Sequence, residues 1–171
     1  MIENVKKLFS YNWSEVFTKL KTSENEIEVP ESVATSIKNG FILSLIYSAI
    51  TMALPILALI SVAFFLPEAG STGSVMAVFG TFVVGFAIGA AILLLIMNFL
   101  IKGKPRNNLR YIVVFVLVAI GAAYSCLSVL TSIKSGLFMF VVSLIAFGIG
   151  FIAYANVAVG CIDFCYEADK E

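Results

Sequence analysis

Four long stretches of the chain contain no Asp, Glu, Lys, Arg or His. They run from Asn39 to Pro67, Ala69 to Ile101, Tyr111 to Ile133 and Ser135 to Ile162. A helix needs about 20 apolar residues to cross the hydrocarbon core of a bilayer, so each stretch supports one crossing and none supports two. We therefore predict an all-α protein, a transmembrane bundle of four helices at about residues 39–66, 74–101, 111–133 and 136–162.

The composition supports a lipid environment. Hydrophobic residues make up 60% of the chain and charged residues 13%, whereas a soluble domain is nearer half apolar and a quarter charged. A chain of 171 residues has too small a core to hide that excess from water. The formal net charge is zero, so no general attraction to nucleic acid is indicated. The bilayer is the first partner that the sequence predicts.

The basic residues lie almost entirely on one side of the predicted bundle. They precede the first crossing, fill the loop after the second, and recur at the C-terminus; Lys134 alone falls on the opposite side. Because Lys and Arg are retained on the cytoplasmic side, this asymmetry predicts an integral, multi-pass protein with both termini in the cytoplasm. Residues 164–171 would form an acidic cytoplasmic tail.

Residues 1–38 form a separate region, predicted to be a cytoplasmic amphipathic helix followed by a linker. Apolar side chains recur at helical spacing from Ile2 to Leu20 and fall on one side of a single helix. Such a helix lies in the membrane interface, with aromatic side chains at headgroup depth and lysines toward water. A helix packed on a partner protein or on the cytoplasmic loops is the alternative. The predicted interface residues are Phe9, Trp13, Phe17, Lys6 and Lys21.

Small residues recur every fourth position in the second crossing: Gly73, Ala77, Thr81, Gly85 and Gly89. This spacing makes a groove in which another membrane helix approaches closely. The groove could be a dimerisation face, or it could receive a helix of the same chain. Internal packing is the simpler expectation, because four helices in one chain must pack somewhere. Ala146, Gly148 and Gly150 on the fourth crossing would be its natural partners.

Three further residues could have special roles within the crossings. Pro55 removes the backbone bond to the carbonyl of Thr51 and predicts a helix kink. Asn98 and Asn156 both sit toward the cytoplasmic side and could hydrogen-bond to each other across the bundle. Helix association is the simpler role for this polar contact; a substrate contact is the alternative.

The sequence offers no catalytic constellation. There are no histidines, which removes the commonest general base and metal ligand. The three cysteines are Cys126, Cys161 and Cys165; two thiols one helical turn apart do not complete a tetrahedral metal site. We expect no cofactor, no metal and no enzymatic activity.

The first 50 residues resemble small prokaryotic members of the Yip family of polytopic membrane proteins. The resemblance rests on residues 4–9 (NVKKLF), residues 13–21 (WSEVFTKLK), a short acidic linker, and a first crossing beginning FILSLIYSAI at residues 41–50. It implies a role in membrane organisation or trafficking. Members of that family usually have five crossings, whereas four are counted here.

Two functional hypotheses follow. The first is a non-catalytic membrane protein, acting as a structural or accessory subunit of a larger assembly or as a membrane organiser, with other membrane subunits or a second copy as partners. The second is a small channel or transporter component, which would use the kinked first helix together with Asn98 and Asn156.

Overall fold

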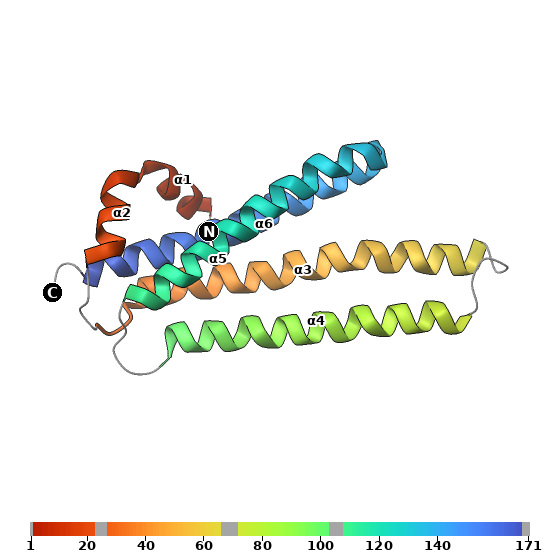
Figure 1. Ribbon diagram of the computed structural model, residues 1–171, viewed down its shortest axis with the longest axis horizontal. Coiled ribbons are helices and arrows are strands. Elements are labelled where there is room, and N and C mark those ends of the chain that lie inside the picture. Colours follow the sequence, from red (N-terminus) through yellow and green to blue (C-terminus); the bar gives the residue numbers. More distant parts are fainter. Residues whose placement is uncertain (1, 23–26, 66–71, 103–107, 169–171) are drawn as a thin grey trace.

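The computed structural model describes residues 2–22, 27–65, 72–102 and 108–168, and its elements are helical (Figure 1). Two short helices come first and four long helices follow. Four of the helices are long and apolar enough to cross a membrane, so the predicted fold class is confirmed. The elements are α1 (Ile2–Ser10), α2 (Trp13–Thr22), α3 (Glu31–Phe65), α4 (Thr72–Ile101), α5 (Asn108–Ser132), a 3₁₀ turn η1 (Ile133–Ser135) and α6 (Leu137–Ala168).

The N-terminal region is two helices rather than the single helix expected from its periodicity. The chain leaves the helical conformation at Tyr11 and Asn12 and begins again at Trp13. The break at Tyr11 and Asn12 allows α1 and α2 to turn different faces toward the rest of the molecule. Val16 points inward and is buried, whereas Phe17 beside it is exposed. Together α1 and α2 form what we call the N-terminal hairpin.

Two of the long helices exceed the thickness of a bilayer. α3 has 35 residues and α6 has 32, which at 1.5 Å per residue makes each of them about 50 Å long. The hydrocarbon core is about 30 Å thick. α3 begins directly after Pro30, whose carbonyl accepts a bond from Ala34, and it runs without interruption into the first crossing. A substantial part of both helices must therefore lie outside the hydrocarbon.

The connections are only partly described. Between α5 and α6 the chain turns through η1 and Gly136, whose φ of 101° is the left-handed conformation that glycine adopts without a steric penalty. The chain therefore reverses direction between α5 and α6. The connection between α3 and α4 and most of the basic loop between α4 and α5 lie outside the described residues.

The long helices form two antiparallel hairpins that meet at one end. α3 packs against α4 and α5 packs against α6, while α3 and α6 make the most extensive contact between the hairpins. In Figure 1 the hairpins converge where the termini lie and diverge toward the opposite end. The N-terminal hairpin lies against α6 at the converging end.

Most of the buried side chains are concentrated at this converging end. We call this cluster the terminal core. Only 6% of the candidate spans of α4 and α5 is buried, against 33% for α6. The cluster draws on the N-terminal hairpin and on every long helix; its buried members are Val16, Ile27, Val33, Ile37, Phe41, Leu100, Tyr111, Val114, Val157, Cys161, Ile162, Phe164, Cys165 and Ala168.

Tyr111 joins three helices within the terminal core. Its ring stacks on Phe164 of α6 with a centroid separation of 3.7 Å. Its hydroxyl donates to the carbonyl of Leu100, 2.9 Å away. That carbonyl belongs to the last turn of α4, where backbone acceptors have no partner within the helix. A single side chain of α5 thus holds α6 and also satisfies the end of α4.

Glycines allow α3 and α6 to approach closely. A Cβ added at Gly40 would lie 2.8 Å from the carbonyl oxygen of Ala153 and 2.4 Å from a methyl group of Val157. At Gly160 an added Cβ would lie 2.6 Å from Ile37. Gly150, which was predicted to be a packing residue, faces the ring of Tyr47. The close crossing of α3 and α6 therefore requires glycine, which has no side chain, at positions 40 and 160.

Replacing Gly40 by alanine should destabilise this crossing. The methyl group meets backbone as well as side chain, and overpacking of this kind costs about 1–3 kcal/mol. Gly148→Ala is the matched control, because nothing described lies within 4 Å of its added Cβ. Gly148→Ala should be neutral, or stabilising by up to about 1 kcal/mol through helix propensity. Thermal unfolding in mild detergent measures the difference, and equal midpoints for the two variants would contradict the packing described.

Candidate functional site

A polar contact joins the beginning of the chain to the last crossing. Asn156 on α6 is fully buried. Its side-chain oxygen accepts a hydrogen bond from the amide of Asn4, 2.9 Å away, and its own amide donates to the carbonyl of Ile152. The amide of Asn4 also donates to the hydroxyl of Ser36. One amide of α1 therefore bonds to both α3 and α6.

A second polar contact lies nearer the end of α6. The ammonium of Lys7 lies 2.6 and 2.8 Å from the two carboxylate oxygens of Asp163. The hydroxyl of Tyr11 donates to the same carboxylate at 2.5 Å. Burial, followed by the bond to Asp163, raises the pKa of Tyr11, so the phenol remains a donor at neutral pH. We call the bonds of Asn4, Lys7 and Tyr11 to α6 the clasp.

Ring contacts hold the rest of the N-terminal hairpin in place. Tyr11 stacks on Tyr166 with ring centroids 6.0 Å apart. The ammonium of Lys19 lies 4.5 Å from the centre of the Tyr166 ring, an attractive cation–π geometry. The hairpin is therefore docked on α6 of its own chain, whereas the expected alternative was packing on a partner protein or on the cytoplasmic loops.

Several of the predicted interface residues nevertheless remain exposed on the docked hairpin. Phe9 is 72% exposed, Phe17 57% and Trp13 38%. Lys6 is also exposed, whereas the side chain of Lys21 is outside the described residues. An apolar surface of this kind on a helix beside membrane-spanning segments suits the membrane interface. Docking on α6 and contact with lipid are compatible, because Phe9 and Phe17 keep more than half of their surface exposed while the hairpin contacts α6.

Three hydroxyl groups meet in the interior where α3, α5 and α6 come together. Ser125 lies 3.3 Å from the hydroxyl of Tyr47 and 3.2 Å from that of Tyr154. It also donates to the carbonyl of Gly121 within α5. The two tyrosine rings meet edge to face. The groups satisfy one another, as buried polar groups between membrane helices must, so the cluster acts as a joint between helices.

The two asparagines predicted to meet are not brought together. Asn156 bonds to Asn4, whereas Asn98 lies on an exposed side of α4. The reason is the arrangement of the helices, because α4 packs principally against α3 and not against α6. The predicted bond between Asn98 and Asn156 is therefore wrong, although Asn156 does join parts of the bundle.

The small-residue face of α4 is largely open. A Cβ added at Gly85 or Gly89 would meet nothing described within 4 Å, and the same is true of Gly148 on α6. Thr81 is exposed, and the surroundings of Gly73 and Ala77 are outside the described residues. The expected internal packing of the α4 glycines on α6 is therefore wrong for Gly85 and Gly89. No helix in the described part of the chain fills their side of α4.

Gly85 and Gly89 instead line a groove between α3 and α4. Its volume is about 280 Å³. The wall on α3 consists of Leu45, Ser48 and Met52, and the wall on α4 includes the two glycines, Phe86 and Ala90. Open, apolar and bordered by glycine backbone, it has the features of a surface that receives a further membrane helix.

The side chain of Thr51, one turn before the predicted kink at Pro55, bonds to the helix backbone. α3 is helical through Pro55, whose side-chain surroundings are not described. The hydroxyl of Thr51 donates to the carbonyls of Tyr47 and Ser48, both at 3.0 Å. It is therefore engaged with the preceding turn, an interaction that itself tends to bend a helix.

Among the described residues there is no group of three or more His, Cys, Asp or Glu side chains that could hold a metal ion. Cys161 and Cys165 are buried in the terminal core, and Cys126 is exposed on α5. No protein-family model, curated protein or solved structure matches the chain. The geometry alone must therefore carry the functional argument.

The clasp was not predicted from the sequence. Asn4 and Asn156 are separated by 152 positions, and Lys7 and Asp163 by 156. No periodicity connects such distant residues. The one available signal is that Asp163 is the first charged residue after a long apolar stretch, where an acid close to lipid benefits from a cationic partner.

Removing the carboxylate of Asp163 should release the N-terminal hairpin. A hydrogen bond to a charged group contributes about 1.5–3 kcal/mol, and the partial exposure of Lys7 reduces this toward the value for a surface pair. We expect Asp163→Leu to speed amide hydrogen exchange throughout α1 by about tenfold, which corresponds to about 1.4 kcal/mol. Tyr11→Phe, which removes one of the bonds, should give a smaller increase. Unchanged exchange in Asp163→Leu would show that the clasp does not hold the hairpin.

Proposed function

We propose that the protein is a non-catalytic subunit of a membrane assembly, with a structural or accessory role, and that α4 is the helix through which it associates. The observation that supports this is the open glycine groove on α4. In lipid, helices gain little from burying apolar surface, because lipid tails are equally apolar. Close backbone contact at small residues is what favours association there.

The protein already uses this device internally. Gly40 and Gly160 let α3 and α6 come into close contact, and a side chain at either position would collide with the neighbouring helix. Gly85 and Gly89 offer equivalent gaps on α4, where nothing described occupies them. α4 therefore carries a surface suited to helix association, and no described helix occupies it. A membrane-embedded segment of another subunit, or of a second copy, fits this surface.

The N-terminal hairpin adds a second feature to this proposal. Its exposed aromatic side chains suit the interface between membrane and water, and its clasp fixes it against α6. The resemblance of the first 50 residues to the Yip family implies membrane organisation or trafficking, and it remains part of the proposal. A protein with these features would present one fixed surface to lipid and another to its partner.

The alternative, a channel or transporter component, has less support. Its expected landmarks do not meet in one place: Asn98 lies on the outside of α4, and Asn156 is bonded to Asn4. The interior hydroxyl groups of Tyr47, Ser125 and Tyr154 are bonded to one another. No feature of the described residues favours a conducting path over a packed joint.

Filling the groove tests the proposal. Gly85→Leu with Gly89→Leu should be tolerated by the fold, since both sites open onto free space, but should abolish association. Native mass spectrometry after gentle extraction from the membrane should show the wild-type chain with a partner subunit or a second copy, and the double variant alone. Ala87→Leu, an exposed position on the opposite flank of α4, should behave like the wild type. A wild-type chain that is extracted as a lone monomer would contradict the proposal.

We also propose that both termini face the cytoplasm, as the distribution of basic residues indicates. In a chain carrying Cys126→Ala, the remaining cysteines are buried, so a new exposed cysteine can be labelled selectively. Lys134→Cys should react with a membrane-impermeant thiol reagent added to intact cells, whereas Glu28→Cys should react only after the cells are opened. Both positions are exposed in the fold. The reverse pattern of labelling would invert the proposed orientation.

A further inference from the structure

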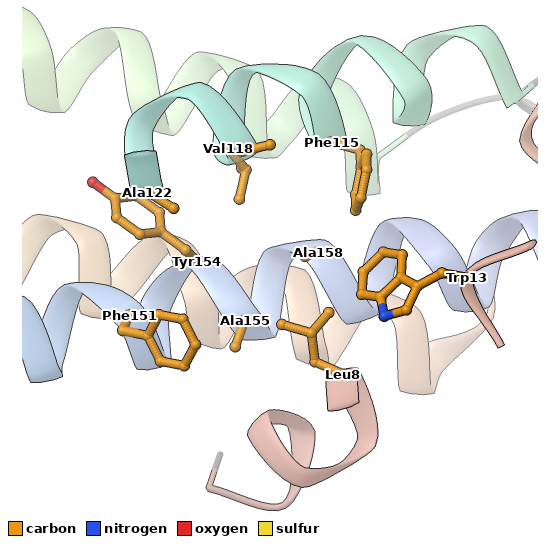
Figure 2. Close-up of a pocket in the computed structure, with 10 residues that line it drawn as sticks. Leu8, Trp13, Phe115, Val118, Ala122, Phe151, Tyr154, Ala155 and Ala158 are labelled. Atoms are coloured by element: carbon orange, nitrogen blue, oxygen red, sulfur yellow. The ribbon is translucent and has the colours of Figure 1, made fainter. Parts of the chain in front are cut away.

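A second cavity lies between the N-terminal hairpin and the helices α5 and α6. Its volume is about 130 Å³ (Figure 2). Leu8 and Trp13 of the hairpin form one side, and α5 and α6 form the other. Phe115 and Phe151 stand at its edges, with their rings 6.4 Å from Trp13 and 6.3 Å from Phe9, respectively.

The lining of this cavity excludes water as its natural content. Nearly every lining group is hydrocarbon: the floor consists of Val118, Ala119 and Ala122 of α5 and of Ala155 and Ala158 of α6. The polar side-chain groups among the lining residues are the hydroxyl of Tyr154, which is already engaged with Ser125, and the indole N–H of Trp13. A bound water needs two to four polar partners, and an apolar cavity of about 150 Å³ stays dry and accepts apolar guests. The ligand class that fits is therefore hydrocarbon.

The cavity is continuous with the surface that faces lipid. Ala119 lines it and is also exposed, and the neighbouring residues Val116, Leu117 and Ile120 of α5 are exposed apolar side chains. α5 is a candidate membrane span over Leu109–Ser132, so this surface contacts the bilayer. A hydrocarbon chain can therefore pass from the lipid phase into the cavity without crossing any polar region.

We propose that the cavity holds a segment of one acyl chain of a bilayer phospholipid, between the N-terminal hairpin and the pair α5 and α6. The acyl chain would fill the space above the small alanine side chains of α5 and α6, and it would contact the indole of Trp13 on the hairpin side. Trp13, with an apolar ring and a donor N–H, suits a position between acyl chain and headgroup. The site is separate from the α4 groove and does not depend on the proposed assembly.

The single tryptophan of the chain makes the site measurable. The full chain is reconstituted into phosphatidylcholine vesicles in which some lipids carry bromine on the upper part of an acyl chain, since bromine quenches tryptophan fluorescence on contact. Trp13 should be strongly quenched. Ala119→Leu fills the mouth of the cavity from an exposed position and should reduce this quenching by about twofold.

Two further variants separate the cavity from bulk lipid. Ala123→Leu lies one helical turn from Ala119, is equally exposed and does not line the cavity, so its quenching should match the wild type. Ala122→Leu fills the cavity from a second position and should act like Ala119→Leu; circular dichroism confirms that each variant remains folded.

Two outcomes would overturn the proposal. Equal quenching in the variants at 119, 122 and 123 would mean that Trp13 senses only the surrounding bilayer. An absence of quenching in the wild type would mean that no acyl chain reaches Trp13, and that the cavity is empty or is filled by another part of a protein.

Discussion

The fold depends on the mismatch between helix length and membrane thickness. Inside the bilayer, moving an apolar side chain from lipid to a helix interface gains little free energy, so packing there must rely on close fit and a few hydrogen bonds. Outside the bilayer, in contact with water, the hydrophobic effect acts in full. α3 and α6 extend well beyond a bilayer core, and the buried residues gather where they extend. The terminal core is thus the part of the molecule that resembles a soluble protein.

This division explains which contacts occur where. At the converging end, large side chains such as Tyr111 and Phe164 are fully buried and stack closely. Farther along the crossings, Gly150 lies against the ring of Tyr47, and the hydroxyl groups of Tyr47 and Tyr154 meet at Ser125. The clasp connects the two regimes, because Asn156 is within the apolar part of α6 while Asp163 is near its charged end. Losing the clasp would uncover one side of the terminal core.

The helices could be predicted from the sequence because charge is excluded from lipid on physical grounds, and that exclusion leaves a visible pattern. The partners of the helices could not. The spacing of Gly85 and Gly89 indicates a groove but does not say which helix enters it, and α3 turned out to flank the groove without filling it. Gly150 was expected to pack on the small residues of the second crossing, yet its neighbour is Tyr47 of α3. Such pairings depend on which helices are neighbours in the bundle, and the sequence pattern of one helix does not encode that arrangement.

The break between α1 and α2 shows a similar limit. Ile2 to Leu20 follow one helical periodicity, but the structure turns at Tyr11, and this places Val16 inward and Tyr11 against Asp163. A local pattern reports what a segment could do alone. The bonds from α1 to α6, which decide how the segment folds, involve residues more than 150 positions away.

That separation has a consequence for biosynthesis. Because α1 finds its binding surface on α6, it must wait until the residues between them and α6 itself have been translated and inserted. At about 5–20 residues per second, the delay is on the order of ten seconds or more. Throughout that time Phe9, Trp13 and Phe17 are exposed without the clasp, and the membrane interface is the nearby apolar surface on which they can be buried. Once α6 is complete, α1 can form its bonds to Asn156 and Asp163 and dock on the bundle.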